Sequence, residues 1–92
     1  MKKIVCFYLD GCPYCAKARR AFDELRAENP AWENIPVEWV ENAHQPSDLK
    51  TFDYYYVPTL YAGDEKIYEA SPGDGYEKIK AEVRRALEKA VA

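Results

Sequence analysis

The sequence predicts a single α/β domain, residues 1–92, in which a four-stranded mixed sheet is flanked by three helices. The chain has 92 residues, which is the size of one small domain. Apolar, β-branched segments and segments of helical periodicity follow one another in the order β-α-β-α-β-β-α. The first three segments form a strand–helix–strand unit, which favours parallel pairing of the two strands through a right-handed crossover.

The first strand is expected at residues 4–9, because a short continuous apolar run is typical of a strand covered on both faces. An Asp-Gly pair ends this run. Pro13 then favours the first turn of a helix, where the missing N–H of proline costs nothing. Apolar residues recur at helical spacing as far as Glu28, and Pro30 ends the helix shortly afterwards.

The second strand is expected at Val37–Glu41, after a connector at residues 32–36. Val37, Trp39 and Glu41 should share one face of this strand. A short second helix is expected from Gln45 to about Phe52.

Two further strands, at Thr59–Ala62 and at residues 66–69, flank a Gly-Asp turn and predict a β-hairpin. The last helix is expected at residues 76–90, where apolar residues form one stripe. Asp74 and Glu77 have the spacing of a capping box at its start, and Ser71 with Asp74 is a competing start.

Composition excludes several classes of protein. The chain is 48% hydrophobic and 14% aromatic, which excludes intrinsic disorder. A net charge of −3 gives no sign of a nucleic-acid partner or an anionic membrane. No apolar run approaches the roughly 18 residues that span a membrane, and the run after Lys2 and Lys3 is too short for a signal peptide. We therefore expect a monomeric, cytoplasmic protein without a membrane or nucleic-acid partner.

Two of the three cysteines, Cys12 and Cys15, have Cys-x-x-Cys spacing at the junction of the first strand and the first helix. In a reducing compartment this spacing indicates redox chemistry or a metal. Cys12 lies just before the helix, where free N–H groups and the helix dipole favour a thiolate, so it is the expected nucleophile. Cys15 lies about one turn later and is the expected resolving cysteine.

A zinc site is the alternative, since Cys6 and His44 together with the two motif cysteines would give the four ligands that a structural zinc ion needs. Cys6, however, falls in the apolar first strand and should be buried as a small hydrophobic residue. We therefore prefer the redox interpretation, with no bound metal and no tightly bound cofactor.

The segment Cys12-Pro13-Tyr14-Cys15, preceded by glycine, resembles the active-site motif of the dithiol glutaredoxins, which belong to the thioredoxin superfamily. Val57-Pro58-Thr59 resembles the second signature of that family, and Gly73-Asp74 resembles the third. The order of elements matches over nearly the whole chain, so the resemblance implies a thioredoxin-like fold and thiol–disulfide oxidoreductase activity.

The resemblance also implies roles for single residues. The peptide bond before Pro58 should be cis, and the backbone of Val57 should pair with the substrate. Gly73 and Asp74 should bind the carboxylate of glutathione, the expected co-substrate. The substrate-binding residues expected in this way are Pro13, Tyr14, Tyr56, Val57, Pro58, Gly73 and Asp74. The implied partners are disulfide-containing or glutathionylated proteins, with glutathione or a disulfide reductase as reductant. A glutathione-assisted iron–sulfur cluster, found in some relatives, stays open.

Three departures from the family pattern support an alternative. Leu9 and Asp10 stand where a basic residue is frequent, and the charge of Asp10 disfavours a nearby thiolate. Tyr56 replaces a common threonine, and the third motif lacks paired glycines. The first alternative is a thioredoxin-like disulfide reductase that depends on a flavoprotein reductase. The second is a non-enzymatic binding module that uses the tyrosines at residues 54–56.

Overall fold

The computed structural model describes residues 1–42 and 52–92, which form an α/β fold. The elements are β1 (Ile4–Tyr8), α1 (Pro13–Glu28), the 3-10 helix η1 (Pro30–Asn34), β2 (Val37–Glu41), β3 (Thr59–Ala62), β4 (Glu65–Glu69) and α2 (Tyr76–Val91). The strand order is β2-β1-β3-β4. β1 pairs in parallel with β2 and antiparallel with β3, which pairs antiparallel with β4. The predicted four-stranded mixed sheet and its hairpin are confirmed.

The bounds of α1 and β2 agree with the sequence prediction, whereas the connector between them is more ordered than expected. Residues 30–34 form η1, and the Arg26 guanidinium donates hydrogen bonds to the carbonyls of Trp32 and Ile35 at 3.3 and 3.1 Å. β1 ends at Tyr8, one residue earlier than predicted, and Leu9 is 43% exposed. Leu9 therefore belongs to the loop that leads to the cysteines.

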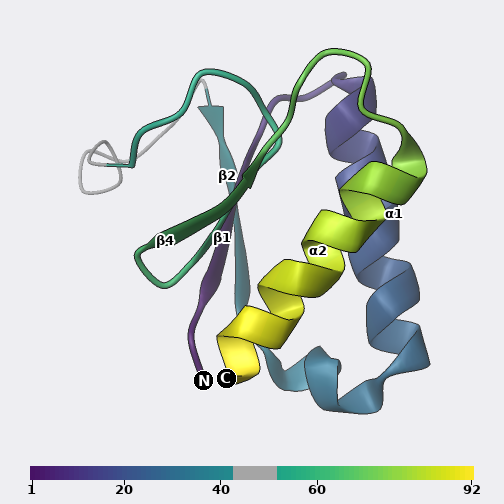
Figure 1. Ribbon diagram of the computed structural model, residues 1–92, viewed down its shortest axis with the longest axis vertical. Coiled ribbons are helices and arrows are strands. Elements are labelled where there is room, and N and C mark those ends of the chain that lie inside the picture. Colours follow the sequence, from purple (N-terminus) through teal and green to yellow (C-terminus); the bar gives the residue numbers. More distant parts are fainter. Residues whose placement is uncertain (43–51) are drawn as a thin grey trace.

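The expectation of three helices around the sheet is met only in part. The described residues contain two α-helices, α1 and α2, and both cover the same face of the sheet (Figure 1). The helix expected from Gln45 falls almost wholly on residues 43–51, which lie outside the described part of the chain. Phe52, its expected last residue, is described and is not helical.

The capping box expected from Asp74 and Glu77 at the start of α2 is not formed. The N-cap of α2 is Gly75, and no side chain caps it. The Asp74 carboxylate instead accepts hydrogen bonds from the Ser71 N–H at 3.0 Å and from the Tyr68 hydroxyl at 2.5 Å. Asp74 thus orders the turn before the helix, because its neighbours in space offer better-placed donors than the helix amides.

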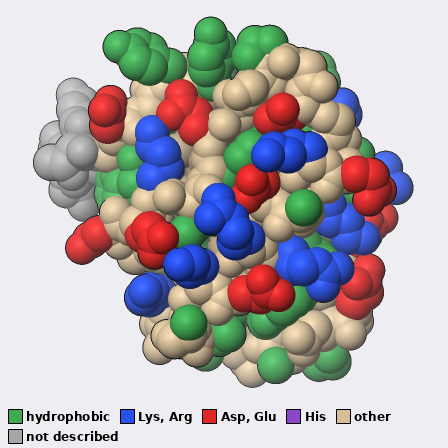
Figure 2. Space-filling model, viewed as in Figure 1, with side chains coloured by type: hydrophobic (Ala, Val, Ile, Leu, Met, Phe, Trp, Pro, Cys, Tyr) green, Lys and Arg blue, Asp and Glu red, His purple; other side chains and the backbone are tan. Residues whose placement is uncertain are grey.

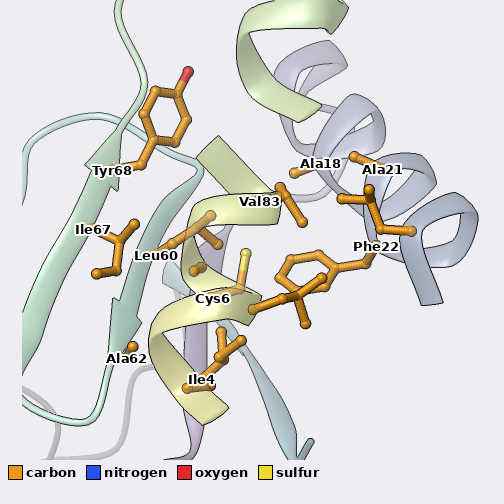
Figure 3. Packing of buried hydrophobic residues seen from close by; sticks show 14 of the residues in the cluster. Ile4, Cys6, Ala18, Ala21, Phe22, Leu60, Ala62, Ile67, Tyr68 and Val83 are labelled. Atoms are coloured by element: carbon orange, nitrogen blue, oxygen red, sulfur yellow. The ribbon is translucent and has the colours of Figure 1, made fainter. Parts of the chain in front are cut away.

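The core lies between the sheet and the two helices (Figure 3). Ile4 and Cys6 from β1 and Leu60 from β3 meet Phe22 from α1 and Val83 from α2, and each is at most 2% exposed. Burial of such side chains stabilises the fold by roughly 1.5–3 kcal/mol each for the larger ones. The prediction that Cys6 is a buried core residue is confirmed.

The second face of the sheet is covered by the segment that precedes β3. Phe7 stacks on Tyr54 with ring centroids 4.5 Å apart and contacts Phe52 at 5.6 Å. The Tyr61 hydroxyl donates to the Asp53 carbonyl at 2.8 Å. These contacts attach residues 52–57 to the sheet and so fix the start of β3 next to the end of β1.

The surface carries charges of both signs. On the face shown in Figure 2, Lys and Arg side chains are interspersed with Asp and Glu, so no single-sign patch covers it. Neither described helix combines the length and the apolar character that crossing a membrane requires.

Candidate active site

Cys12 lies at the junction that the sequence predicted. It is the N-cap of α1 with extended backbone angles (φ −79°, ψ 120°), and its N–H bonds the Leu9 carbonyl at 3.2 Å. No side chain caps α1, its first turn contains no acidic residue, and Pro13 occupies the first position. The uncapped N–H groups of the first turn and the helix dipole therefore favour an anion at this end of α1, where Cys12 is the N-cap.

Cys15 has a different environment, one turn inside α1. It is only 5% exposed, and all three cysteines are free thiols. The pKa of Cys15 is raised to about 12, mainly by burial and also by the hydrogen bond and the charge of Cys12, while a hydrogen bond to the Leu9 backbone opposes the shift. Cys15 is therefore a protonated thiol at neutral pH. The structure thus separates an accessible sulfur at the helix end from a buried one behind it.

The loop before β3 forms one wall beside Cys12. The peptide bond between Val57 and Pro58 is cis, as the resemblance implies. The Cys12 thiol donates a weak hydrogen bond to the Val57 carbonyl, with the sulfur 3.9 Å from the oxygen. Among the described residues no group accepts from the Val57 N–H. The Val57 backbone therefore offers both a donor and an acceptor next to the sulfur.

A carboxylate that the sequence analysis did not single out holds this wall. Glu69 on β4 accepts hydrogen bonds from the backbone N–H groups of Tyr55 and Tyr56 at 2.8 and 2.9 Å, and it pairs with Lys66 at 2.8 Å. Lys66 above all, with the two backbone donors, lowers the pKa of Glu69 to about 2. Only the tertiary fold reveals this role, because Glu69 is 12 residues beyond Val57 and looks like any surface glutamate in sequence.

Replacing Glu69 with alanine is expected to lower the free energy of unfolding by about 1–3 kcal/mol, because two backbone donors lose a charged acceptor. The pKa is lowered in the folded state, so this stabilisation is present above the ordinary pKa of glutamate and is lost as pH falls towards 2. Urea denaturation at several pH values measures it. Glu65→Ala, which removes a surface pair with Lys89 at 3.5 Å, is the control and should change stability by less than about 1 kcal/mol. Equal losses in the two variants would contradict the role of Glu69.

The first and third motifs meet through one hydrogen bond. The Gly73 N–H donates to the Tyr14 hydroxyl at 2.9 Å, although the two residues are 59 positions apart. The Asp74 carboxylate is engaged by Tyr68 and Ser71, and the Tyr68 hydroxyl above all lowers its pKa. The fold therefore brings Tyr14 and Gly73 into contact near Cys12, but the Gly73 N–H is already bonded to Tyr14 and the Asp74 carboxylate to Tyr68 and Ser71.

The tyrosines before Pro58 divide between core and surface. Tyr54 packs on Phe7, whereas Tyr55 and Tyr56 are 92% and 55% exposed. Figure 2 shows hydrophobic side chains gathered along the upper edge of the molecule, where the loops after β1, before β3 and before α2 meet in Figure 1. Exposed aromatic rings beside a reactive sulfur are typical of a contact surface.

A cavity of about 320 Å³ adjoins the cysteines on the side of β2. Tyr8, Asp10, Arg19 and Trp39 contribute to its walls, together with Cys12, Cys15 and neighbouring residues of the loop and of α1. The site residues expected from the sequence include neither Arg19 nor Trp39. No local pattern links them, because they lie 20 residues apart on different elements.

Within residues 1–42 and 52–92, no three His, Cys, Asp or Glu side chains converge to hold a metal ion. Cys6, one of the ligands considered for zinc, is fully buried in the core. His44, the other, lies outside the described residues. A zinc site assembled from Cys6, Cys12 and Cys15 is therefore not formed.

Comparisons with known proteins agree with this geometry. Residues 7–72 match the sequence profile of a family described as glutathione S-transferase, N-terminal domain. This match covers more than half of the chain and includes both the Cys12–Cys15 motif and Pro58. No curated protein is similar enough in sequence to count as a match.

Solved structures share the fold. Thioredoxin 1 from the thermophilic eubacterium Thermosipho africanus superposes with a TM-score of 0.57 at 18% identity, covering 98% of this chain and 99% of that one. The first two thioredoxin domains of Saccharomyces cerevisiae Eps1p give a TM-score of 0.56 at 21% identity, covering 94% of this chain and 36% of that one. The fold is therefore thioredoxin-like.

Proposed function

The chain belongs to the glutathione S-transferase N-terminal domain family, and we propose that it is a glutaredoxin-like thiol–disulfide oxidoreductase that uses the Cys12–Cys15 dithiol. In this proposal its substrates are protein disulfides or glutathione mixed disulfides, and it acts in a reducing compartment such as the cytoplasm. The single observation that carries the proposal is the position of Cys12: its sulfur lies at the uncapped N-terminus of α1 and also within reach of the Val57 carbonyl.

The proposed reaction is a two-electron exchange. The Cys12 thiolate attacks one sulfur of the substrate disulfide, so a Cys12–substrate disulfide forms and the other substrate sulfur leaves as a thiolate. Cys15 then gives up its proton and attacks the Cys12 sulfur. The second substrate thiolate leaves, and a Cys12–Cys15 disulfide remains. The leaving thiolates are protonated, the substrate is reduced, and a thiol or a reductase restores the dithiol.

The Val57 backbone supports substrate binding in this proposal. Its N–H and carbonyl can pair with an extended segment of a substrate, since among the described residues the N–H has no acceptor and the carbonyl accepts only the weak Cys12 bond. Pro58 is buried directly after Val57, and the cis bond between them shapes this wall in the proposal. The other binding residues of the proposal, Pro13, Tyr14 and Tyr56, are sequence neighbours of Cys12 or Val57. Backbone pairing of this kind accepts many sequences, as expected for an enzyme with several protein substrates.

Two candidate functions differ in the reductant that restores the dithiol. The family description names glutathione, which supports glutathione as co-substrate. One observation favours the second candidate, a thioredoxin-like reductase served by a flavoprotein. The Gly73 N–H, expected to bind the glutathione carboxylate, already donates to Tyr14, and Asp74 already bonds Tyr68.

The test measures turnover of a glutathione mixed disulfide and of insulin with glutathione as reductant, and separately with a flavoprotein disulfide reductase. The glutaredoxin-like proposal expects turnover with glutathione. Tyr14→Phe frees the Gly73 N–H and should raise the rate with glutathione about two- to ten-fold, the effect of one hydrogen bond. Tyr76→Phe, which removes a hydroxyl bonded to Glu24, is the matched control and should leave that rate unchanged. Turnover with the flavoprotein alone would instead establish the second candidate.

A further inference from the structure

The cavity beside β2 is separate from the Val57 wall. Its lining comes from β1, the loop after it, α1 and β2, with no residue from 52–92. Because β1 lies between β2 and β3 in the sheet, the cavity and the Val57 wall flank Cys12 on two sides. A substrate that crosses Cys12 from the Val57 wall therefore continues into this cavity.

Arg19 supplies a positive charge to the lining of the cavity. Its guanidinium lies 4.2 Å from the centre of the Trp39 ring and 5.8 Å from that of Tyr8, as in a cation–π contact. The neighbouring Arg20 pairs with Glu24 at 3.1 Å, whereas Arg19 makes no ion pair within the described residues. Trp39 itself is fixed by Phe22, whose ring centroid is 5.4 Å away. Arg19 is thus held in place by aromatic rings, and no group in residues 1–42 or 52–92 accepts a hydrogen bond from its guanidinium.

Asp10 places an opposite charge on the same cavity. It is exposed on the loop before Cys12, whereas Arg19 is stacked against the strand side. The walls between the two charges are mainly apolar, with Leu9 and Trp39 among them. The cavity therefore suits a segment with an apolar part and a carboxylate, and Asp10 limits how strongly that carboxylate is attracted.

We propose that Arg19, stacked on Trp39, is a specificity-determining residue that binds a carboxylate of an acidic polypeptide segment next to the substrate disulfide. This inference rests on the proposed function and adds the substrate class. A polypeptide is favoured over a small thiol because the same segment can pair with the Val57 backbone on the other side of Cys12. The preference for Glu over Lys in the substrate should be about five-fold, the upper range for an exposed ion pair.

The experiment uses short peptides whose cysteine carries a 2-thiopyridyl group, with Glu, Gln or Lys on both sides. Attack by Cys12 forms the Cys12–peptide disulfide and releases 2-thiopyridone, which is followed by stopped-flow absorbance. The wild type should react about five-fold faster with the Glu peptide than with the Lys peptide. Arg19→Met, which keeps an unbranched side chain over Trp39, should bring this ratio close to one, and Arg19→Lys should restore part of it. Asp10→Asn should increase the ratio.

Arg20→Met is the matched control, because it removes the same net charge from the adjacent helix position. A ratio equal to that of the wild type is expected. The proposal is overturned if Arg19→Met keeps the wild-type ratio or if Arg20→Met lowers the ratio equally. It is also overturned if Arg19→Met slows only the reaction with glutathione mixed disulfide and none of the reactions with peptides.

The same peptides with serine in place of cysteine test binding without any exchange. Titration with the Glu peptide should shift the indole N–H resonance of Trp39 in the wild type and not in Arg19→Met. An absent shift in the wild type counts against the inference. If instead no 2-thiopyridyl peptide reacts faster with the wild type than with Cys12→Ser, the proposed function fails, whatever the binding result.

Discussion

Replacing Cys12 with serine is expected to reduce the rate of disulfide reduction at least about a thousand-fold, because the attacking sulfur is lost. A serine hydroxyl stays protonated at neutral pH even at a helix N-terminus. Cys15 cannot take over, since it is 5% exposed and burial raises its pKa to about 12. Reduction of insulin and of a glutathione mixed disulfide measures the loss, with circular dichroism to show that the fold is kept.

Cys6→Ala is the matched control, since it removes a thiol that lies in the core and not beside the substrate. Its activity per folded molecule should be that of the wild type. Cys15→Ser should instead accumulate a Cys12–substrate mixed disulfide that mass spectrometry detects. Full activity of Cys12→Ser would exclude the oxidoreductase proposal. Retention of the cellular role by the inactive Cys12→Ser protein would favour the binding-module alternative.

The resolving step is expected to accelerate about ten-fold per pH unit between pH 7 and 9, roughly a hundred-fold in total. Below its raised pKa, Cys15 is almost wholly a thiol, and the reactive thiolate fraction grows ten-fold with each unit of pH. Joining Cys12 to a substrate removes the contributions of Cys12 to this pKa. Burial, the largest cause, remains, so the pKa stays above the ordinary value and the rate rises with pH throughout this range.

The measurement starts from a purified mixed disulfide between Cys12 and a fluorescent peptide, and follows peptide release by stopped flow. In the control, Cys15→Ser carries the same mixed disulfide and is resolved by an added thiol, so the pH dependence should follow that thiol. A release rate in the wild type that reaches a plateau near pH 7 would show that Cys15 ionises at its ordinary pKa, and that burial does not control the step.

Local patterns explain why most elements were predictable. The continuous apolar run at residues 4–9 specifies a strand buried on both faces, and Pro13 specifies where α1 begins. Because both signals are local, they also place Cys12 at the junction. The capping box expected for Asp74 with Glu77 is not formed, for the opposite reason. Tyr68 and Ser71 both donate to the Asp74 carboxylate and so keep it from the first amides of α2. Whether these donors are within reach depends on where the fold places the turn.

The sequence by itself determined the sheet, the start of α1 and the position of the Cys12–Cys15 pair, because strand burial, helix capping and Cys-x-x-Cys spacing are properties of neighbouring residues. Only the tertiary structure decided which groups surround that pair. It brought Glu69 to the backbone of Tyr55 and Tyr56, Tyr14 to Gly73, and Arg19 to Trp39. Each of these contacts joins residues from different elements. Their partners are set by the packing of helix on sheet, which no local pattern of residues encodes.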